Sequence, residues 1–62
     1  MLNGKNVEVG ETVRFTMCSN WTFKQDSTHE VTHVSDMDQN GWFDIKVKGF
    51  KDWYSCLNFS KV

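Results

Sequence analysis

Apolar residues recur at every second position directly after an Asn-Gly pair in the middle of the chain. The residues at these positions are Phe43, Ile45 and Val47, and the alternate positions hold Trp42, Asp44 and Lys46. Because successive side chains of a β-strand point to opposite faces, the first set predicts a buried face and the second an outer face. Asn40-Gly41 favours a two-residue type I′ turn, in which both central residues have positive φ. Residues 36–47 therefore predict a β-hairpin.

Two strands are predicted ahead of the hairpin. In residues 8–17 a glycine interrupts the pattern, and the inward positions that follow it are Val13, Phe15 and Met17. Residues 28–35 are rich in β-branched residues, which favour strands. Because Val31 and Val34 are three positions apart, a strand that buries both needs a β-bulge between them.

The other segments predict a long loop and a two-part C-terminal end. Residues 18–27 are polar apart from Trp21 and Phe23, which either tuck into the core or line a binding surface. Residues 53–56 predict a fourth strand after a short turn. Residues 57–62 predict one helical turn and a last short strand. The inward side chains expected there are Leu57, Phe59 and Val62.

Composition favours an all-β chain. The 62 residues include no proline, and no segment keeps the i, i+3, i+4, i+7 spacing of an amphipathic helix over three turns. A chain of this length forms a single domain, residues 1–62, with a small core. Five short strands must protect their edges, and curling one sheet into a small closed barrel does so.

Two segments resemble known small barrels. Val9-Gly10-Glu11-Thr12-Val13 is similar to the Val-Gly-Asp-x-Val entry of Tudor-type and Src-homology-3-type (SH3-type) barrels. Residues 53–62 are similar to the closing strand, helical turn and final strand of those folds, and to the ends of very small bacteriophage proteins with this barrel. The resemblance implies a five-stranded SH3-like (Tudor-like) barrel with one short helical turn near the C-terminus, and a phage accessory protein.

Charge and cysteine content narrow the function classes. Seven Lys and Arg residues against eight Asp and Glu residues give a net charge of −1, so the chain has no overall attraction for a phosphate backbone. Cys18 and Cys56 are too few for a disulfide framework, and we expect both to be reduced. Residues 1–6 contain no apolar leader, and no later run could span a membrane. We expect a cytoplasmic protein, in the host cytoplasm if a phage encodes it, with no membrane contact.

His29-Glu30-Val31-Thr32-His33 matches the His-Glu-x-x-His motif of zinc hydrolases. That chemistry requires a helix, in which residues four apart lie about 5–6 Å from each other and can share one zinc ion. In a strand such residues lie roughly 13 Å apart. Because the β-branched residues favour a strand, a zinc hydrolase is a minor alternative, and we predict a non-enzymatic protein without metal or cofactor.

The hairpin tip also matches part of a calcium-binding loop. Asp36, Asp38 and Asn40, followed by Gly41, have the spacing of the first six positions of that loop. Val47 stands at the twelfth position, where calcium requires a bidentate carboxylate. An acidic turn explains the same residues without a metal ion.

Aromatic and charged residues of the hairpin and the following strand form the predicted binding face. Its members are Trp42, Asp44, Lys46, Lys48, Phe50, Trp53 and Tyr54. We expect a non-catalytic small-barrel binding module for a host or phage protein, with aromatic anchors and orienting charges. The alternative partner is single-stranded nucleic acid, with bases stacked on the aromatic residues and phosphates on Lys46, Lys48 and Lys51. We expect a monomer or a weak homodimer, because a small core gains from covering the edge beside residues 57–62.

Overall fold

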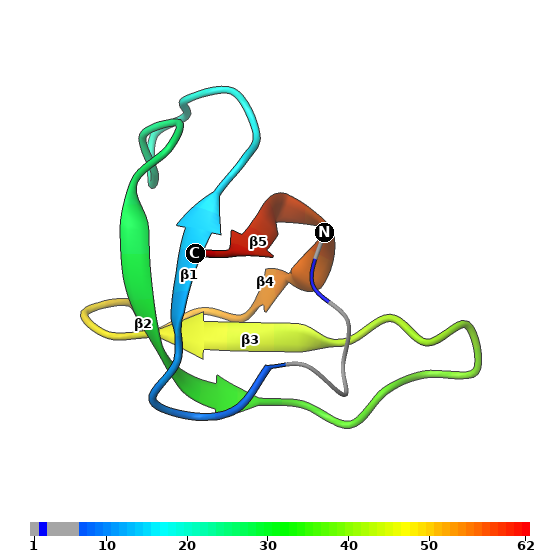
Figure 1. Ribbon diagram of the computed structural model, residues 1–62. Coiled ribbons are helices and arrows are strands. Elements are labelled where there is room, and N and C mark those ends of the chain that lie inside the picture. The colour runs from blue at the N-terminus through cyan, green and yellow to red at the C-terminus, as the bar shows by residue number, and fades with distance from the viewer. Residues whose placement is uncertain (1, 3–6) are drawn as a thin grey trace.

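One antiparallel sheet of five strands makes up most of the fold, in the order β4-β3-β2-β1-β5 (Figure 1). The computed structural model describes residues 2 and 7–62. The segment expected to contain no apolar leader, residues 1–6, therefore lies mostly outside the described residues. The elements are β1 (Thr12–Phe15), β2 (Thr28–Val34), β3 (Asp44–Val47), β4 (Tyr54–Ser55), the 3₁₀ turn η1 (Cys56–Asn58) and β5 (Phe59–Lys61). The all-β prediction is confirmed, and within the described residues the edge strands β4 and β5 do not pair to close the sheet.

Strand β2 pairs with both β1 and β3, and a β-bulge lies along its pairing with β3. His29 on β2 pairs with Val13 on β1, while Val31 pairs with Val47 on β3. The register shifts before the next pair, which joins His33 to Lys46. This shift is the predicted bulge, and it allows Val34 to pack against the core although Val31 is three positions away. Figure 1 shows the resulting bend of β2.

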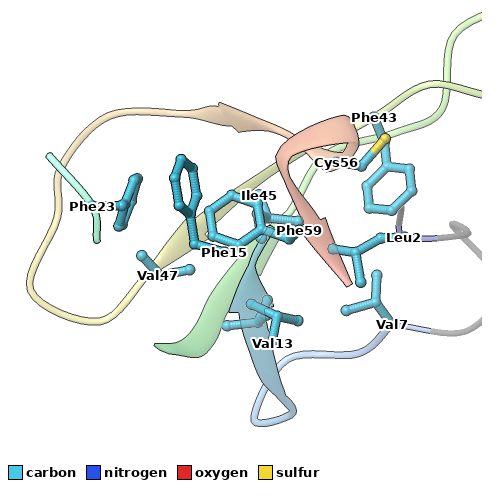
Figure 2. Packing of buried hydrophobic residues seen from close by; sticks show 11 residues of the cluster. Leu2, Val7, Val13, Phe15, Phe23, Phe43, Ile45, Val47, Cys56 and Phe59 are labelled. Carbon is cyan, nitrogen blue, oxygen red and sulfur yellow. The ribbon is translucent and has the colours of Figure 1, made fainter. Parts of the chain in front are cut away.

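The core collects apolar side chains from four of the strands, from η1 and from the connecting segments (Figure 2). Its buried members are Leu2, Val7, Val13, Phe15, Phe23, Val31, Phe43, Ile45, Val47, Cys56 and Phe59. The alternation after the Asn-Gly pair therefore predicted the buried face of β3 correctly. The inward positions of β1 and the inward aromatic residue of β5 are confirmed as well.

Three residues predicted to point inward are exposed: Met17, Leu57 and Val62. Met17 lies beyond β1, because the chain turns after Phe15, whose carbonyl accepts a hydrogen bond from the backbone of residue 26. In a 3₁₀ turn, residues three apart lie on the same side. Cys56 and the residue three positions on are therefore buried, and Leu57 points outward. Val62 follows the end of β5.

The hairpin turn differs from the predicted type I′ turn. Among the described residues Asn40 does not have a positive φ, whereas Gly41 has a φ of 82°. The Gly41 amide donates to the Asp38 carbonyl at 3.1 Å, and the Asp38 amide donates to the Trp42 carbonyl at 2.8 Å. This pattern is a type I turn followed by a left-handed glycine, with aspartate at the first position, where type I turns favour it. The Asp38 carboxylate stabilises the turn further by accepting hydrogen bonds from the backbone amides of Asn40 and Trp42.

Candidate functional site

A row of three side chains crosses the outer face of strands β2 and β3 and the start of β4. His33 on β2 is paired with Lys46 on β3, and Trp53 directly precedes β4. The Lys46 ammonium nitrogen lies 4.8 Å from the centre of the Trp53 ring, which is a cation–π contact. The His33 and Trp53 rings meet at a centroid distance of 6.3 Å in an edge-to-face arrangement. Trp53 is therefore held between a cation and an imidazole and does not project freely.

Asp44, the first residue of β3, and Trp42, two positions before it, are exposed as well. Both alternate with the buried residues Phe43 and Ile45, so they belong to the outer face, as predicted. The indoles keep much of their surface in solvent, with 39% of Trp42 and 46% of Trp53 exposed. We call these five exposed or partly exposed residues the outer patch: His33, Trp42, Asp44, Lys46 and Trp53.

The outer patch has the composition of a recognition surface. Tryptophan is among the residues that contribute most binding energy at interfaces, because it buries a large area at a small entropic cost. An exposed cation–π contact contributes about 0.5–1 kcal/mol and limits the motion of the Lys46 side chain. The patch thus presents partly ordered aromatic surface together with one acidic and one basic side chain.

Two residues predicted for the binding face belong to the core side instead. The rings of Phe50 and Tyr54 are half-buried and pack against Phe23, at centroid distances of 4.7 and 4.9 Å. Tyr54 pairs with the buried residue Ile45, which places it on the inner side of the sheet. Lys48, the remaining predicted member, is exposed just beyond the end of β3, and its backbone amide donates to the carbonyl of Glu30.

Two exposed rings, those of His33 and Trp21, were not included in the predicted binding face. The sequence favoured His33 as a surface imidazole on a strand, and the bulge after Val31 turns position 33 away from the core. Trp21 is fully exposed, whereas Phe23, two positions later in the same loop, is buried. Of the two outcomes predicted for the aromatic residues of this loop, Phe23 packs into the core and Trp21 lies on the surface.

The two histidines of the zinc motif serve different faces of β2. The His29 ring packs on the buried Phe23 at 4.8 Å, and the His33 ring packs on the exposed Trp53. The motif lies on a strand, as predicted, so its spacing does not converge on one ion. Across residues 2 and 7–62, no three His, Cys, Asp or Glu side chains form a group able to hold a metal ion.

The acidic hairpin tip and the two cysteines have ordinary structural environments. One carboxylate oxygen of Asp38 already accepts two backbone hydrogen bonds within the turn. Both cysteines are free thiols, with Cys18 exposed and Cys56 buried. In the part of the chain that the structure describes, no helix has the length and apolar character needed to cross a bilayer.

No family model, curated protein or solved structure matches this chain.

Proposed function

We propose that this protein is a non-catalytic binding module that docks onto another protein through the outer patch. The observation that carries the proposal is that two partly exposed indoles, Trp42 and Trp53, lie on the outer face, with the ammonium group of Lys46 held over the Trp53 ring. Such a surface supplies large aromatic contact area from ordered side chains, which is the composition typical of interface hot spots.

Local charge favours a protein partner over a nucleic acid. Asp44 lies within the outer patch, and Asp36 and Asp38 lie in the adjoining hairpin. These carboxylates repel phosphates, and the net charge of −1 gives no long-range attraction to compensate. A protein surface that offers both an acidic and a basic group can pair with Asp44 and Lys46 at once.

We also propose that the chain folds as an SH3-like small barrel and comes from a phage, as the sequence resemblance implies. A sheet bent at β2, with a 3₁₀ turn between its last two strands, is compatible with an SH3-like (Tudor-like) small barrel. We place the protein in the cytoplasm, as a phage accessory protein that modulates a host or phage protein. The support for this setting is the resemblance of residues 9–13 and 53–62 to small phage barrels.

Affinity capture with matched tryptophan variants tests the outer patch. The tagged protein is incubated with lysate of a candidate host, in parallel with Trp42→Ala, Trp53→Ala and Trp21→Ala. Trp21 is the control, because it is an exposed indole outside the outer patch. We expect a specific protein to be captured by the wild type and the control, and its yield to fall at least about tenfold for each patch variant. Equal capture by all four proteins would show that the binding surface lies elsewhere.

Single-stranded nucleic acid is the second candidate, because exposed indoles beside lysine can stack bases and contact phosphates. The specific observation in its favour is the contact between Lys46 and Trp53. Fluorescence anisotropy with labelled oligonucleotides at increasing salt separates the two proposals. Binding that weakens steeply with salt supports nucleic acid, and no binding at low salt rejects it.

A further inference from the structure

The tip of the β2–β3 hairpin contains the sequence Asn40-Gly41, and both residues are exposed. The backbone amide of Asn40 is hydrogen-bonded, whereas its side chain forms no hydrogen bond with the described residues, so the carboxamide is open to water. Gly41 has no side chain to shield its nitrogen. Apart from its chain neighbours, no atom lies within 4 Å of the position that a Cβ would take there. The Gly41 nitrogen is therefore the least hindered nucleophile that the carboxamide can meet.

We propose that Asn40 is a site of spontaneous deamidation, and that the rate of this reaction is set by the opening of the hairpin tip. The Gly41 nitrogen loses its proton to hydroxide and attacks the side-chain carbonyl carbon of Asn40. The bond from that carbon to Nδ2 breaks, and the nitrogen takes a proton from water and leaves as ammonia. Water then opens the cyclic imide at either carbonyl and returns a proton to the Gly41 nitrogen. Opening at the side-chain carbonyl gives aspartate, and opening at the backbone carbonyl gives isoaspartate.

The closed turn opposes this reaction. The Gly41 amide donates to the Asp38 carbonyl at 3.1 Å, so the attacking nitrogen is held in a hydrogen bond. The Asp38 carboxylate accepts from the amides of Asn40 at 2.8 Å and Trp42 at 3.0 Å. The third residue of a type I turn has a ψ near 0°. Ring closure requires a different ψ, because the Asn40 Cβ and the Gly41 nitrogen must be eclipsed about the bond from Cα to the carbonyl carbon. The turn must therefore open before the ring can form.

The hydrogen bonds that close the tip lie in solvent. All of residues 36–42 are exposed, and Figure 1 shows this loop projecting beyond the sheet. Hydrogen bonds in such a segment open at a small cost in free energy, since no apolar core has to separate. At the base of the loop, the Ser35 amide donates to the Asp44 carbonyl at 2.9 Å, and the Asp44 amide donates to the Ser35 hydroxyl at 2.8 Å. The tip can therefore open while β2 and β3 stay paired.

The products differ from asparagine in charge and in the length of the main chain. Either product adds a negative charge beside Asp36 and Asp38. Isoaspartate also adds a methylene to the main chain two positions before Trp42, a member of the outer patch. The bond from the Trp42 amide to the Asp38 carboxylate spans this position, so the longer chain displaces the indole. Deamidation thus alters the outer patch slowly and irreversibly, and only the effect on binding rests on the proposed function.

The experiment incubates the full chain at pH 8 and follows it by tryptic peptide mapping with mass spectrometry. Lysines separate Asn40 from the other Asn-Gly pair of the sequence, Asn3-Gly4, so residues 25–46 form a peptide of their own. We expect this peptide to gain the mass of one deamidation, as two products that chromatography resolves. The reaction in the folded protein is about tenfold slower than in a synthetic peptide of residues 35–44, because opening of the tip precedes it. Two results overturn the proposal: no product at Asn40 after about ten half-lives of the synthetic peptide, or a reaction as fast as in that peptide.

Two aspartate variants isolate the turn. Asp38→Ala removes the carboxylate that accepts two backbone amides, and we expect deamidation to become about three- to tenfold faster. Asp36→Ala is the matched control and keeps the wild-type rate, because it removes the same charge from a side chain without hydrogen bonds to the described residues. Asn40→Ala gives no product in the tryptic peptide, and product there would assign the mass change to Gln39 and overturn the proposal. Equal rates for Asp38→Ala and the wild type, or equal acceleration in both aspartate variants, would overturn it as well.

Discussion

Trp21 and Phe23 lie two positions apart in the loop between β1 and β2, residues 16–27, and have opposite environments. The Phe23 ring packs against aromatic rings from several elements, including those of Phe15, Phe59 and His29. Trp21 is fully exposed. In a small domain one buried phenylalanine supplies a large share of the net stability, whereas a fully exposed indole contributes little.

The two rings should therefore respond very differently to substitution. We expect Phe23→Leu to lower the free energy of unfolding by about 1–2 kcal/mol, because the smaller side chain leaves the aromatic cluster underpacked. Trp21→Ala should change it by less than about 0.5 kcal/mol, since the substituted side chain has no packing to lose. Urea unfolding curves of both variants check this prediction through the midpoint at unchanged slope. A loss for Trp21→Ala as large as for Phe23→Leu would mean that the indole packs against the protein in solution.

The alternating pattern of β-strands was enough to predict part of the outer patch. Alternation alone placed Trp42, Asp44 and Lys46 on the outer face. It did not exclude Phe50 and Tyr54 from that face, because they lie at a turn and in a two-residue strand, where periodicity has no length over which to act. Their inward position depends on Phe23, which reaches them from a loop far away in the sequence.

At the level of elements, the tip of the β2–β3 hairpin is set by the Asp38 carboxylate and by Gly41. The carboxylate accepts hydrogen bonds from two backbone amides, and these bonds favour a type I turn ahead of the glycine. Of the Asn-Gly pair, Gly41 has a positive φ and Asn40 does not, and no atom lies within 4 Å of the position that a Cβ would take on Gly41. Substitution of this glycine is therefore opposed by backbone strain and not by crowding.

The two residues of the Asn-Gly pair should consequently differ in tolerance. We expect Gly41→Ala to destabilise the protein by about 1–2 kcal/mol, because alanine is strained in the left-handed region. Asn40→Ala should change stability by less than about 0.5 kcal/mol, since its backbone is in a region that alanine adopts readily. Thermal unfolding of both variants measures the difference. Comparable losses for the two would indicate the type I′ turn, in which both positions need positive φ.

Element type was easier to predict than element boundaries. The bulge in β2 followed from the spacing of Val31 and Val34, because both had to face one core. The end of β1 did not follow from the alternation that continues through Met17. There the backbone of Phe15 forms hydrogen bonds with residues 26 and 27, and these tertiary contacts stop the strand. Such contacts depend on how the loop between β1 and β2 folds back, and the local pattern carries no signal for that.

For the whole molecule, a small core implies that each buried group matters to global stability. A chain of 62 residues buries only about 60% of the surface that its unfolded form exposes, so the net free energy of unfolding is modest. His29 is a half-buried titratable group packed on the aromatic cluster of this core. Its protonation should therefore be visible in global unfolding.

The sign of that effect is set by the lowered pKa. Burial lowers the pKa of His29 in the folded protein below the 6.5 of an exposed imidazole, so below pH 6.5 the unfolded chain binds more protons than the folded protein. The contribution of neutral His29 is complete above pH 6.5 and is lost as the pH falls through the folded-state pKa. We expect the urea midpoint of the wild type to decrease from pH 7.5 to pH 5. His29→Gln should decrease less over that range, and His33→Gln should follow the wild type. Parallel curves for the wild type and His29→Gln would show that another group controls the acid sensitivity of the fold.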